Sequence, residues 1–349
     1  MLDADVQLRL ERLSLDAPVN VGSGEVVALL GPNGAGKSTV LRALAGLLRL
    51  AGGRVALDGT LLEDPAQKVY IPPEKRPVGM MFQDYLLFPH MTAADNVAFG
   101  LRARGVERNQ ARQTANAALE RLGLAEVMAA KPGAMSGGQQ QRVAMARALV
   151  TEPRLLLLDE PIAALDVSTK NDLRRHLRTV LRESQAANVL VTHDLLDAVA
   201  LADRMVVIEH GGIVQAGTPA EVTAQPRSQY VADLVGMNLL QGKANGNVVE
   251  VDGGGRIVVP EALSGHVLAV VPPSAISVHR DKPGTSAENV WPGQIAGVDL
   301  MGDRVRVRID GPPALSAEVS PRIVDELKLD DGGQLWAVVQ AADVRAYTA

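Results

Sequence analysis

The sequence predicts an α/β fold built on a parallel sheet, followed by a smaller β-rich domain. Two wholly apolar runs, at 26–30 and 155–158, have the composition of buried parallel strands. Each run leads directly into glycine-rich or acidic residues. Beyond about residue 234 the sequence changes to Gly, Pro and alternating Val or Ile, which is typical of short strands with one buried face.

The first apolar run leads into the octapeptide GPNGAGKS, which fits the pattern G-x-x-x-x-G-K-[ST]. In that pattern the backbone N–H groups cradle phosphates, the lysine reaches the β- and γ-phosphates, and the hydroxyl binds Mg²⁺. Residues 39–48 read as the helix that follows the loop. We expect a nucleotide to be bound by Gly31, Pro32, Asn33, Gly34, Ala35, Gly36, Lys37, Ser38 and Thr39.

The second apolar run delivers two acids to the carboxyl edge of the sheet, where ligands bind in open α/β folds. Asp159 is expected to hold Mg²⁺, and Glu160 to polarise the water that attacks the γ-phosphate. A strand that ends in two acids is also compatible with an ordinary solvated strand end. The phosphate-binding loop in the same chain favours the catalytic interpretation.

A third string, SGGQ at 136–139 followed by QRVAMARAL at 141–149, resembles the signature motif and helix of the ATP-binding cassette (ABC) ATPases. A serine cap and two glycines let backbone amides approach an anion, so this segment reads as a second phosphate-binding helix terminus. The resemblance implies a homodimer in which each ATP is held between two chains. The partner's γ-phosphate would then be capped by Ser136, Gly137, Gly138 and Gln139.

Three single residues also match the family. Gln83 matches the Q-loop, which touches Mg²⁺ and water, His193 matches the switch histidine that contacts the γ-phosphate, and Asp166 matches the D-loop. The resemblance implies a catalytic set of Glu160, His193, Gln83 and Lys37. The implied ligands of Mg²⁺ are Ser38, Gln83 and Asp159.

Two departures from the family pattern are visible. Ala164 stands where the D-loop usually has a serine. The family commonly stacks an aromatic ring on adenine from just upstream of the phosphate loop, yet residues 11–24 contain no aromatic. We therefore expect adenine to rest on aliphatic surface such as Leu13 or Leu15, with loose selectivity for the base.

The full fold expectation is a phosphate-loop ABC ATPase core with an inserted helical subdomain, followed by a small all-β, OB-like barrel domain. The expected nucleotide-binding domain is 1–234, with the helical subdomain at about 84–150, and the expected C-terminal regulatory or dimerisation domain is 235–349. Within the insertion, 92–105 and 107–123 read as helices, with Thr92 as an N-cap and glycines as stops.

The C-terminal domain contains a weak internal repeat. Residues 238–242 resemble 289–293, and 268–271 resemble 336–339. The spacing differs between the copies, and the valine-rich composition alone could produce such similarity. The repeat suggests a pair of small β-barrels.

Composition restricts the class of protein. The 349 residues carry a formal charge of −5 and no cysteine, which excludes disulfides, thiol catalysis and cysteine metal sites. There is no basic footprint of a nucleic-acid binder. No apolar run approaches the ~20 residues of a membrane span. Together with these features, the resemblance to ABC ATPases implies a peripheral ATPase at the cytoplasmic face of the membrane, joined to integral-membrane permease subunits.

The C-terminal strings narrow the resemblance. TSAEN at 285–289 and the closing segment 338–344 resemble the molybdate-binding-protein-like (Mop) domain of molybdate importer ATPases, and so does IPPEKR at 71–76. The resemblance implies ATP hydrolysis that powers oxyanion import, with molybdate as the main expectation, and an extracytoplasmic oxyanion-binding protein as an indirect partner. Importers of sulfate, ferric iron, polyamines or sugars share the layout and remain alternatives. A soluble ABC ATPase acting on DNA or ribosomes is a remote alternative.

The Mop-like strings also depart from the family. There, an oxyanion is held by a Thr-Ser-Ala-Arg-Asn strand and a closing Lys-Ala-Ser string, whereas this chain has Glu288 in place of the arginine, and Gln340 and Ala342 in place of the lysine and serine. An oxyanion site needs positive charge or several converging donors. We therefore expect the domain to serve dimerisation and not to bind molybdate tightly.

Overall fold

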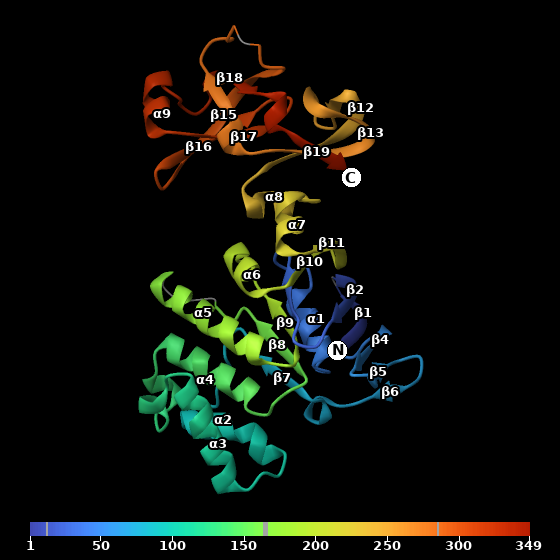
Figure 1. Cartoon of the computed structure of the whole chain (residues 1–349), viewed down its shortest axis with the longest axis vertical. Coiled ribbons are helices and arrows are strands. Elements are labelled where there is room, and N and C mark those ends of the chain that lie inside the picture. Colours follow the sequence, from blue (N-terminus) through green and yellow to red (C-terminus); the bar gives the residue numbers. More distant parts are fainter. Residues whose placement is uncertain (12, 163–166, 285) are drawn as a thin grey trace. The chain divides into compact units, whose positions relative to one another are not determined.

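The computed structural model describes residues 1–11, 13–162, 167–284 and 286–349. The chain forms two compact units, Met1–Ala220 and Glu221–Ala349, and each is described by itself (Figure 1). The division falls earlier than the expected boundary after residue 234. The reason is that helix α8 (Gln229–Val235) packs within the second unit, where its Ala232 contacts the strand residues Leu239, Leu268 and Val270.

The first unit contains one mixed sheet. Its strands are β1 (Leu2–Leu10), β2 (Leu13–Val21), β3 (Val26–Leu30), β4 (Gly52–Leu57), β5 (Thr60–Asp64), β6 (Val69–Tyr70), β7 (Val78–Met81), β8 (Leu155–Asp159), β9 (Ala187–Val191), β10 (Arg204–Glu209) and β11 (Gly212–Gly217). The helices are α1 (Lys37–Leu44), α2 (Ala93–Ala103), α3 (Arg108–Arg121), α4 (Gly137–Leu149), α5 (Val167–Glu183) and α6 (Leu195–Leu201), and α7 (Pro219–Ala224) spans the division between the units.

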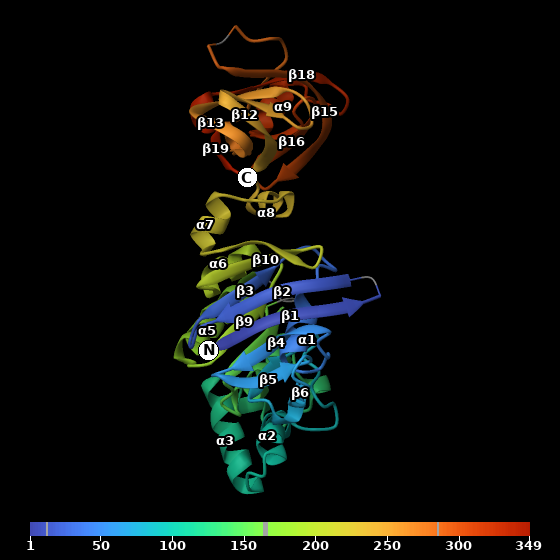
Figure 2. The same ribbon diagram turned by 90° about the vertical axis from the view of Figure 1, so that its right-hand side faces the viewer.

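The strand order is β6-β5-β4-β1-β2-β11-β10-β3-β9-β8-β7. Strands β10, β3, β9, β8 and β7 are parallel to one another, whereas β1, β2, β4, β5 and β6 pair antiparallel with one another and form an arm beside them (Figure 2). Strand β11 joins the two parts, antiparallel to β10 and parallel to β2. The carboxyl ends of the parallel strands therefore meet at one edge, as expected from the two apolar runs.

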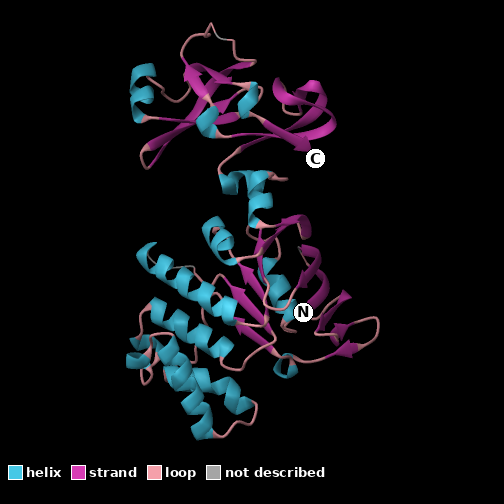
Figure 3. Ribbon diagram, in the orientation of Figure 1, coloured by secondary structure: helices cyan, strands magenta, loops and turns pink. Residues whose placement is uncertain are grey.

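Both faces of the parallel strands are covered by helices (Figure 3). In β8, Leu155 and Leu157 pack on the side of α1, and Leu156 and Leu158 pack on the side of α4 and α5. This alternation follows from the period of two along a strand. Burial on both sides explains why the run is apolar at every position.

The two helices predicted within the insertion are confirmed. Helix α2 begins after Thr92, whose Oγ1 accepts a hydrogen bond from the Asp95 N–H at 3.1 Å. Gly105 and Gly123, which follow α2 and α3, are left-handed (φ 84° and 67°). The predicted helix 39–48 instead runs from Lys37 to Leu44, because left-handed Gly46 (φ 79°) ends it early.

The second unit is mainly β-structure around one core. Its strands are β12 (Asn238–Val251), β13 (Arg256–Val271), β14 (Ser277–His279), β15 (Asn289–Met301), β16 (Arg304–Asp310), β17 (Leu315–Val319), β18 (Gln334–Val339) and β19 (Arg345–Thr348), with helices α8 and α9 (Pro321–Leu327). They form two sheets, β12-β13-β19 and β14-β18-β15-β16-β17. Apolar residues of both sheets belong to a single cluster, so the two sheets share one core.

The internal repeat has a structural counterpart. Asn238 is paired with Val271 across β12 and β13, and Asn289 is paired with Val339 across β15 and β18. The strand that follows each copy then joins the other copy: β14 pairs with β18, and β19 pairs with β13. The two halves have thus exchanged their last strands.

The two repeat asparagines cross-link the halves. The Asn238 amide bonds both the N–H and the carbonyl of Ser316, at 2.6 and 2.9 Å. The Asn289 amide does the same to Val258, at 2.7 and 3.0 Å. Both asparagines are buried, and each satisfies the N–H and the carbonyl of a half-buried strand residue in the other half.

No helix in the described part of the chain has the length and apolarity needed to cross a membrane.

Candidate functional site

The phosphate-binding loop leaves β3 and enters α1 through two glycines that no other residue could replace. Gly31 has φ 148°, and a Cβ there would lie 2.0 Å from the carbonyl oxygen of Ile208 on β10. Gly36, the N-cap of α1, has φ 107°, and a Cβ there would lie 2.7 Å from Leu15 Cδ1. The loop is therefore pressed against neighbouring strands in a conformation open to glycine alone.

Lys37 lies inside this loop. Its Nζ donates to the carbonyl oxygens of Gly31 at 2.7 Å and Pro32 at 3.0 Å, and the residue is only 7% exposed. Burial lowers the pKa of Lys37, while the nearby carboxylates of Glu160 and Asp159 act in the opposite direction. The ammonium is held by neutral acceptors, which a phosphate oxygen could displace.

Ser38 and Asp159 are brought together across the edge of the sheet. The Ser38 hydroxyl donates to Asp159 Oδ1 at 3.0 Å, and Asp159 is 3% exposed. Burial raises the pKa of Asp159, although the hydrogen bond from Ser38 opposes this. A hydroxyl beside a carboxylate whose charge is destabilised by burial fits Mg²⁺, a hard cation that prefers oxygen ligands.

Two of the residues expected to be catalytic, Gln83 and His193, contact the carboxylate of a third, Glu160. Gln83 Nε2 donates to Glu160 Oε2 at 3.1 Å, and His193 Nδ1 lies 3.4 Å from Glu160 Oε1. Glu160 is itself left-handed (φ 48°), and its N–H donates to the Val191 carbonyl at 3.0 Å. This backbone turn at the end of β8 aims the carboxylate between Gln83 and His193, the second residue after β9.

The signature segment forms the helix terminus that the sequence predicts. Ser136 Oγ accepts from the Gln139 N–H at 3.3 Å, and Gln139 Oε1 accepts from the Ser136 N–H at 2.9 Å, which makes a reciprocal capping box for α4. Ser136 and Gly137 are exposed in the single chain. Gly138 completes the first turn of this helix.

Some sequence expectations lie outside the described residues, namely those on Ala164, Asp166 and Thr285. Of the two residues expected to offer surface to adenine, Leu15 is 2% exposed within the core and offers none, whereas Leu13 is half-buried. Both side chains lie on the packed face of β2, and Leu13, the first residue of the strand, is the less covered of the two.

The loop after Gln83 is held largely by packing. Tyr85 and Leu87 pack against core clusters, and the Phe88 ring lies 4.6 Å from that of Phe99, so most of the loop is packed. Leu86 is exposed. The structure also shows two residues that the sequence reasoning missed, Asn96 and Arg147, which hold this loop through its backbone.

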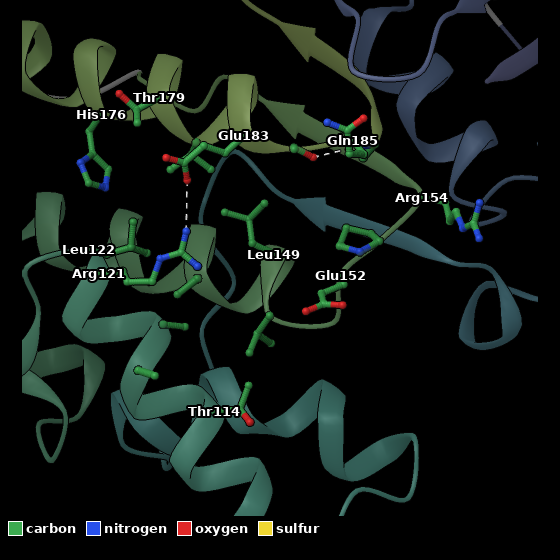
Figure 4. Close-up of a pocket in the computed structure, with 18 of the residues that line it drawn as sticks. Thr114, Arg121, Leu122, Leu149, Glu152, Arg154, His176, Thr179, Glu183 and Gln185 are labelled. Carbon is green, nitrogen blue, oxygen red and sulfur yellow. Dashed lines mark hydrogen bonds and ion pairs between the residues drawn. The ribbon is translucent and has the colours of Figure 1, made fainter.

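A separate cavity of about 790 Å³ lies at the opposite, amino end of β8, next to Pro153 and Arg154 (Figure 4). The Arg121–Glu183 ion pair, at 3.1 Å, crosses it between α3 and α5. The phosphate-binding loop does not line this cavity, so it is distinct from the nucleotide site.

Comparison with known proteins identifies the family. The ABC transporter family matches residues 15–163, and the TOBE domain matches 285–346. A Mycobacterium tuberculosis protein named molybdenum import ATP-binding protein ModC is 41% identical over 96% of this chain and 94% of its own length. The molybdate/tungstate import ATP-binding protein WtpC of Pyrococcus horikoshii is 36% identical over 98% of this chain and 96% of its own.

A solved dimer of the ATP-binding cassette MJ0796, bound to ADP and phosphate, is 29% identical, with a TM-score of 0.54 over 63% of this chain and 99% of that one. The cassette fold expected from the motifs is therefore confirmed, as is the expected family. This chain belongs to the ATP-binding proteins of the ABC transporter family that carry a C-terminal TOBE domain.

Proposed function

We propose that the protein hydrolyses ATP to power import of molybdate or a closely similar oxyanion through a membrane permease. The observation that carries the enzymatic part is the Glu160 carboxylate, held between Gln83 and His193 beside the Ser38–Asp159 pair. The transport part is supported by near full-length similarity to relatives named for molybdenum, molybdate or tungstate import.

In this proposal, the γ-phosphate enters the loop and the Lys37 ammonium exchanges its carbonyl partners for phosphate oxygens. Glu160 accepts a proton from the attacking water, which Gln83 and His193 help to orient. Ser38 and Asp159, with Gln83, would hold Mg²⁺, which when bound neutralises charge developing on the phosphates. The water and the phosphate must both lie within hydrogen-bond reach of these groups.

The active form is proposed to be a homodimer on the cytoplasmic face of the permease. The capped terminus of α4 exposes Ser136 and Gly137 in the single chain, and a helix terminus of this kind stabilises an anion. A second chain would bring that terminus to the γ-phosphate held by the first. The relative MJ0796 has been solved as a dimer, which supports this assembly.

The C-terminal domain is proposed to serve assembly rather than oxyanion binding. The Glu288 carboxylate accepts a hydrogen bond from the Ala341 N–H at 3.2 Å, and this bond lowers the pKa of Glu288. A carboxylate already occupies a donor that an oxyanion would need, and its charge repels a second anion.

Uptake by the assembled transporter tests the proposal directly. Molybdate and tungstate should be imported in an ATP-dependent manner and should stimulate ATP hydrolysis, whereas sulfate should do so weakly. Sulfate uptake that equals or exceeds molybdate uptake would assign the chain to the sulfate importers. ATP hydrolysis that is stimulated by DNA or ribosomes and does not require the permease would refute the transport function.

A further inference from the structure

The loop that follows Gln83 has a backbone that needs support. Tyr85 (φ 60°) and Leu86 (φ 43°) are consecutive non-glycine residues in the left-handed region. In this region Cβ crowds the following carbonyl oxygen, so such residues persist only where their surroundings hold them. Leu86 is 55% exposed, so packing of its side chain does not hold it.

Arg147, on the signature helix α4, supplies the support. Its Nη2 donates to the Tyr85 carbonyl oxygen at 2.7 Å, and its Nη1 donates to the Leu86 carbonyl oxygen at 2.8 Å. Its Cζ lies 5.6 Å from the centroid of the Phe88 ring. A planar, charged fork that spans two successive carbonyls restrains the backbone more strongly than one neutral bond.

The two ends of this loop are also fixed. At the far end, the fully buried Asn96 accepts from the Phe88 N–H at 2.8 Å and donates to the Phe88 carbonyl at 3.2 Å. At the near end, the Tyr85 N–H donates to the Phe82 carbonyl at 2.9 Å and closes a turn around Gln83. Gln83 in turn contacts Glu160 at 3.1 Å.

We propose that Arg147 is a positioning residue for hydrolysis: by holding Tyr85 and Leu86 it keeps Gln83 against Glu160. The contact joins the signature helix to the site of the attacking water through the backbone of one loop. The inference rests on the proposed function, in which Glu160 is the general base. Arg147 acts through Gln83 and not on the reacting atoms.

Kinetics of Arg147→Met in the full chain test this role. Turnover should fall about 10- to 100-fold, the scale of a small displacement at a catalytic group, while the Kd for ATP stays within about twofold. Arg147→Lys, which keeps the charge and can reach one carbonyl, should fall between Met and wild type. Arg104→Met is the matched control, because exposed Arg104 also donates to a loop carbonyl of this subdomain, that of Thr151 at 2.9 Å.

A double-mutant cycle separates positioning from simple structural support. Glycine adopts the left-handed conformation freely, so in a Leu86→Gly background the loop should keep its shape with less help. The loss caused by Arg147→Met should be about tenfold smaller in that background. Equal losses in both backgrounds, or a loss no larger than that of Arg104→Met, would overturn the inference. Arg147→Lys can be placed in the same cycle if the Met variant does not fold.

Glu160→Gln distinguishes the two possible failures. If Glu160→Gln retains normal turnover, Glu160 is not the base and the proposed chemistry fails, whatever Arg147 does. If Glu160→Gln is inactive while Arg147→Met resembles wild type, the proposed function stands and the positioning role alone is wrong.

Discussion

The phosphate-binding loop and the Mop-like strings of the C-terminal domain treat anions in opposite ways. In the loop, the charged group is a cation, Lys37, whose hydrogen bonds go to the neutral carbonyls of Gly31 and Pro32. In the C-terminal domain, the charged group is a carboxylate, Glu288, which occupies the Ala341 N–H. An incoming anion is attracted and gains donors at the first place, but at the second it meets a negative charge. Resemblance to an anion-binding motif is therefore not enough to predict anion binding. The charged side chain in the motif must also be a cation.

The largest expected effect is on the rate of ATP hydrolysis. It tests whether the site at the phosphate-binding loop catalyses hydrolysis as well as binding ATP. Glu160→Gln keeps the shape and the contact with Gln83 but removes the basic carboxylate. Turnover should fall at least ~10²-fold, the scale of a general base, while ATP affinity is retained. Steady-state hydrolysis and ATP titration measure the two quantities. Glu152→Gln, an exposed acid at the other end of β8, is the control and should behave as wild type.

Removing the cation should weaken nucleotide binding. Lys37→Ala should raise the Kd for ATP by about 10- to 100-fold, since hydrogen bonds to charged groups contribute about 1.5–3 kcal/mol. Exposed Lys75 provides the control variant Lys75→Ala. Because burial lowers the pKa of Lys37, ATP affinity should decline with rising pH before an ordinary lysine would titrate. A decline of equal size in Lys37→Ala would show that another group is responsible.

The same lowered pKa has the opposite consequence for the nucleotide-free fold. Between the lowered folded-state pKa and the ordinary lysine value, the unfolded chain binds the proton that the folded chain has released. Lys37 should therefore make stability increase with pH in that window.

In the second region, stability should depend on the asparagines that cross-link the two halves. Asn289→Ala removes two hydrogen bonds to the backbone of half-buried Val258, which at about 0.5–1.5 kcal/mol each should cost about 1–3 kcal/mol of unfolding free energy. Denaturant unfolding of the full chain measures this in the transition of the C-terminal unit. Asn245, exposed on β12, provides the control Asn245→Ala. Equal effects of the two substitutions would argue against the cross-link.

Reversing the charge of Glu288 tests whether this carboxylate prevents the C-terminal domain from binding an oxyanion. The wild-type chain should show no micromolar site for molybdate in calorimetric titration. Glu288→Arg removes the repelling carboxylate and adds a donor, so molybdate affinity should rise by about tenfold or more. Glu261→Arg makes the same change of net charge at another exposed position and should not do this. A stoichiometric micromolar site in wild type, lost on altering Ser286, would restore oxyanion binding to this domain.

The smallest expected effect concerns the base. Stacking of a base on an aromatic ring is worth ~1–3 kcal/mol, and no aromatic precedes the phosphate loop between residues 11 and 24. GTP should therefore bind within about tenfold of ATP. A hundredfold preference for ATP in a competition titration would require a ring from elsewhere in the assembly.

Short-range patterns predicted much of this molecule because each had a local physical cause. Each pattern depends on interactions within a few neighbouring residues, as in the apolar run before Asp159, the loop glycines and the Thr92 cap. The left-handed backbone at Glu160 and Leu86 had no such signal, because these positions do not carry glycine. Likewise, the bonds from Arg147 to the Q-loop join residues about sixty positions apart in the sequence, so spacing within one helix could not indicate them.

The exchange of β14 and β19 between the two repeat halves has a consequence for how this unit can change. Each half lacks the strand that completes its own sheet and obtains it from the other half. The arrangement is that of a domain-swapped dimer whose two subunits are covalently tethered in one polypeptide. Neither half can change its sequence independently, because a substitution that disrupts the last strand of one half removes an edge strand from the sheet of the other. The unit should therefore evolve, open and unfold as an inseparable whole.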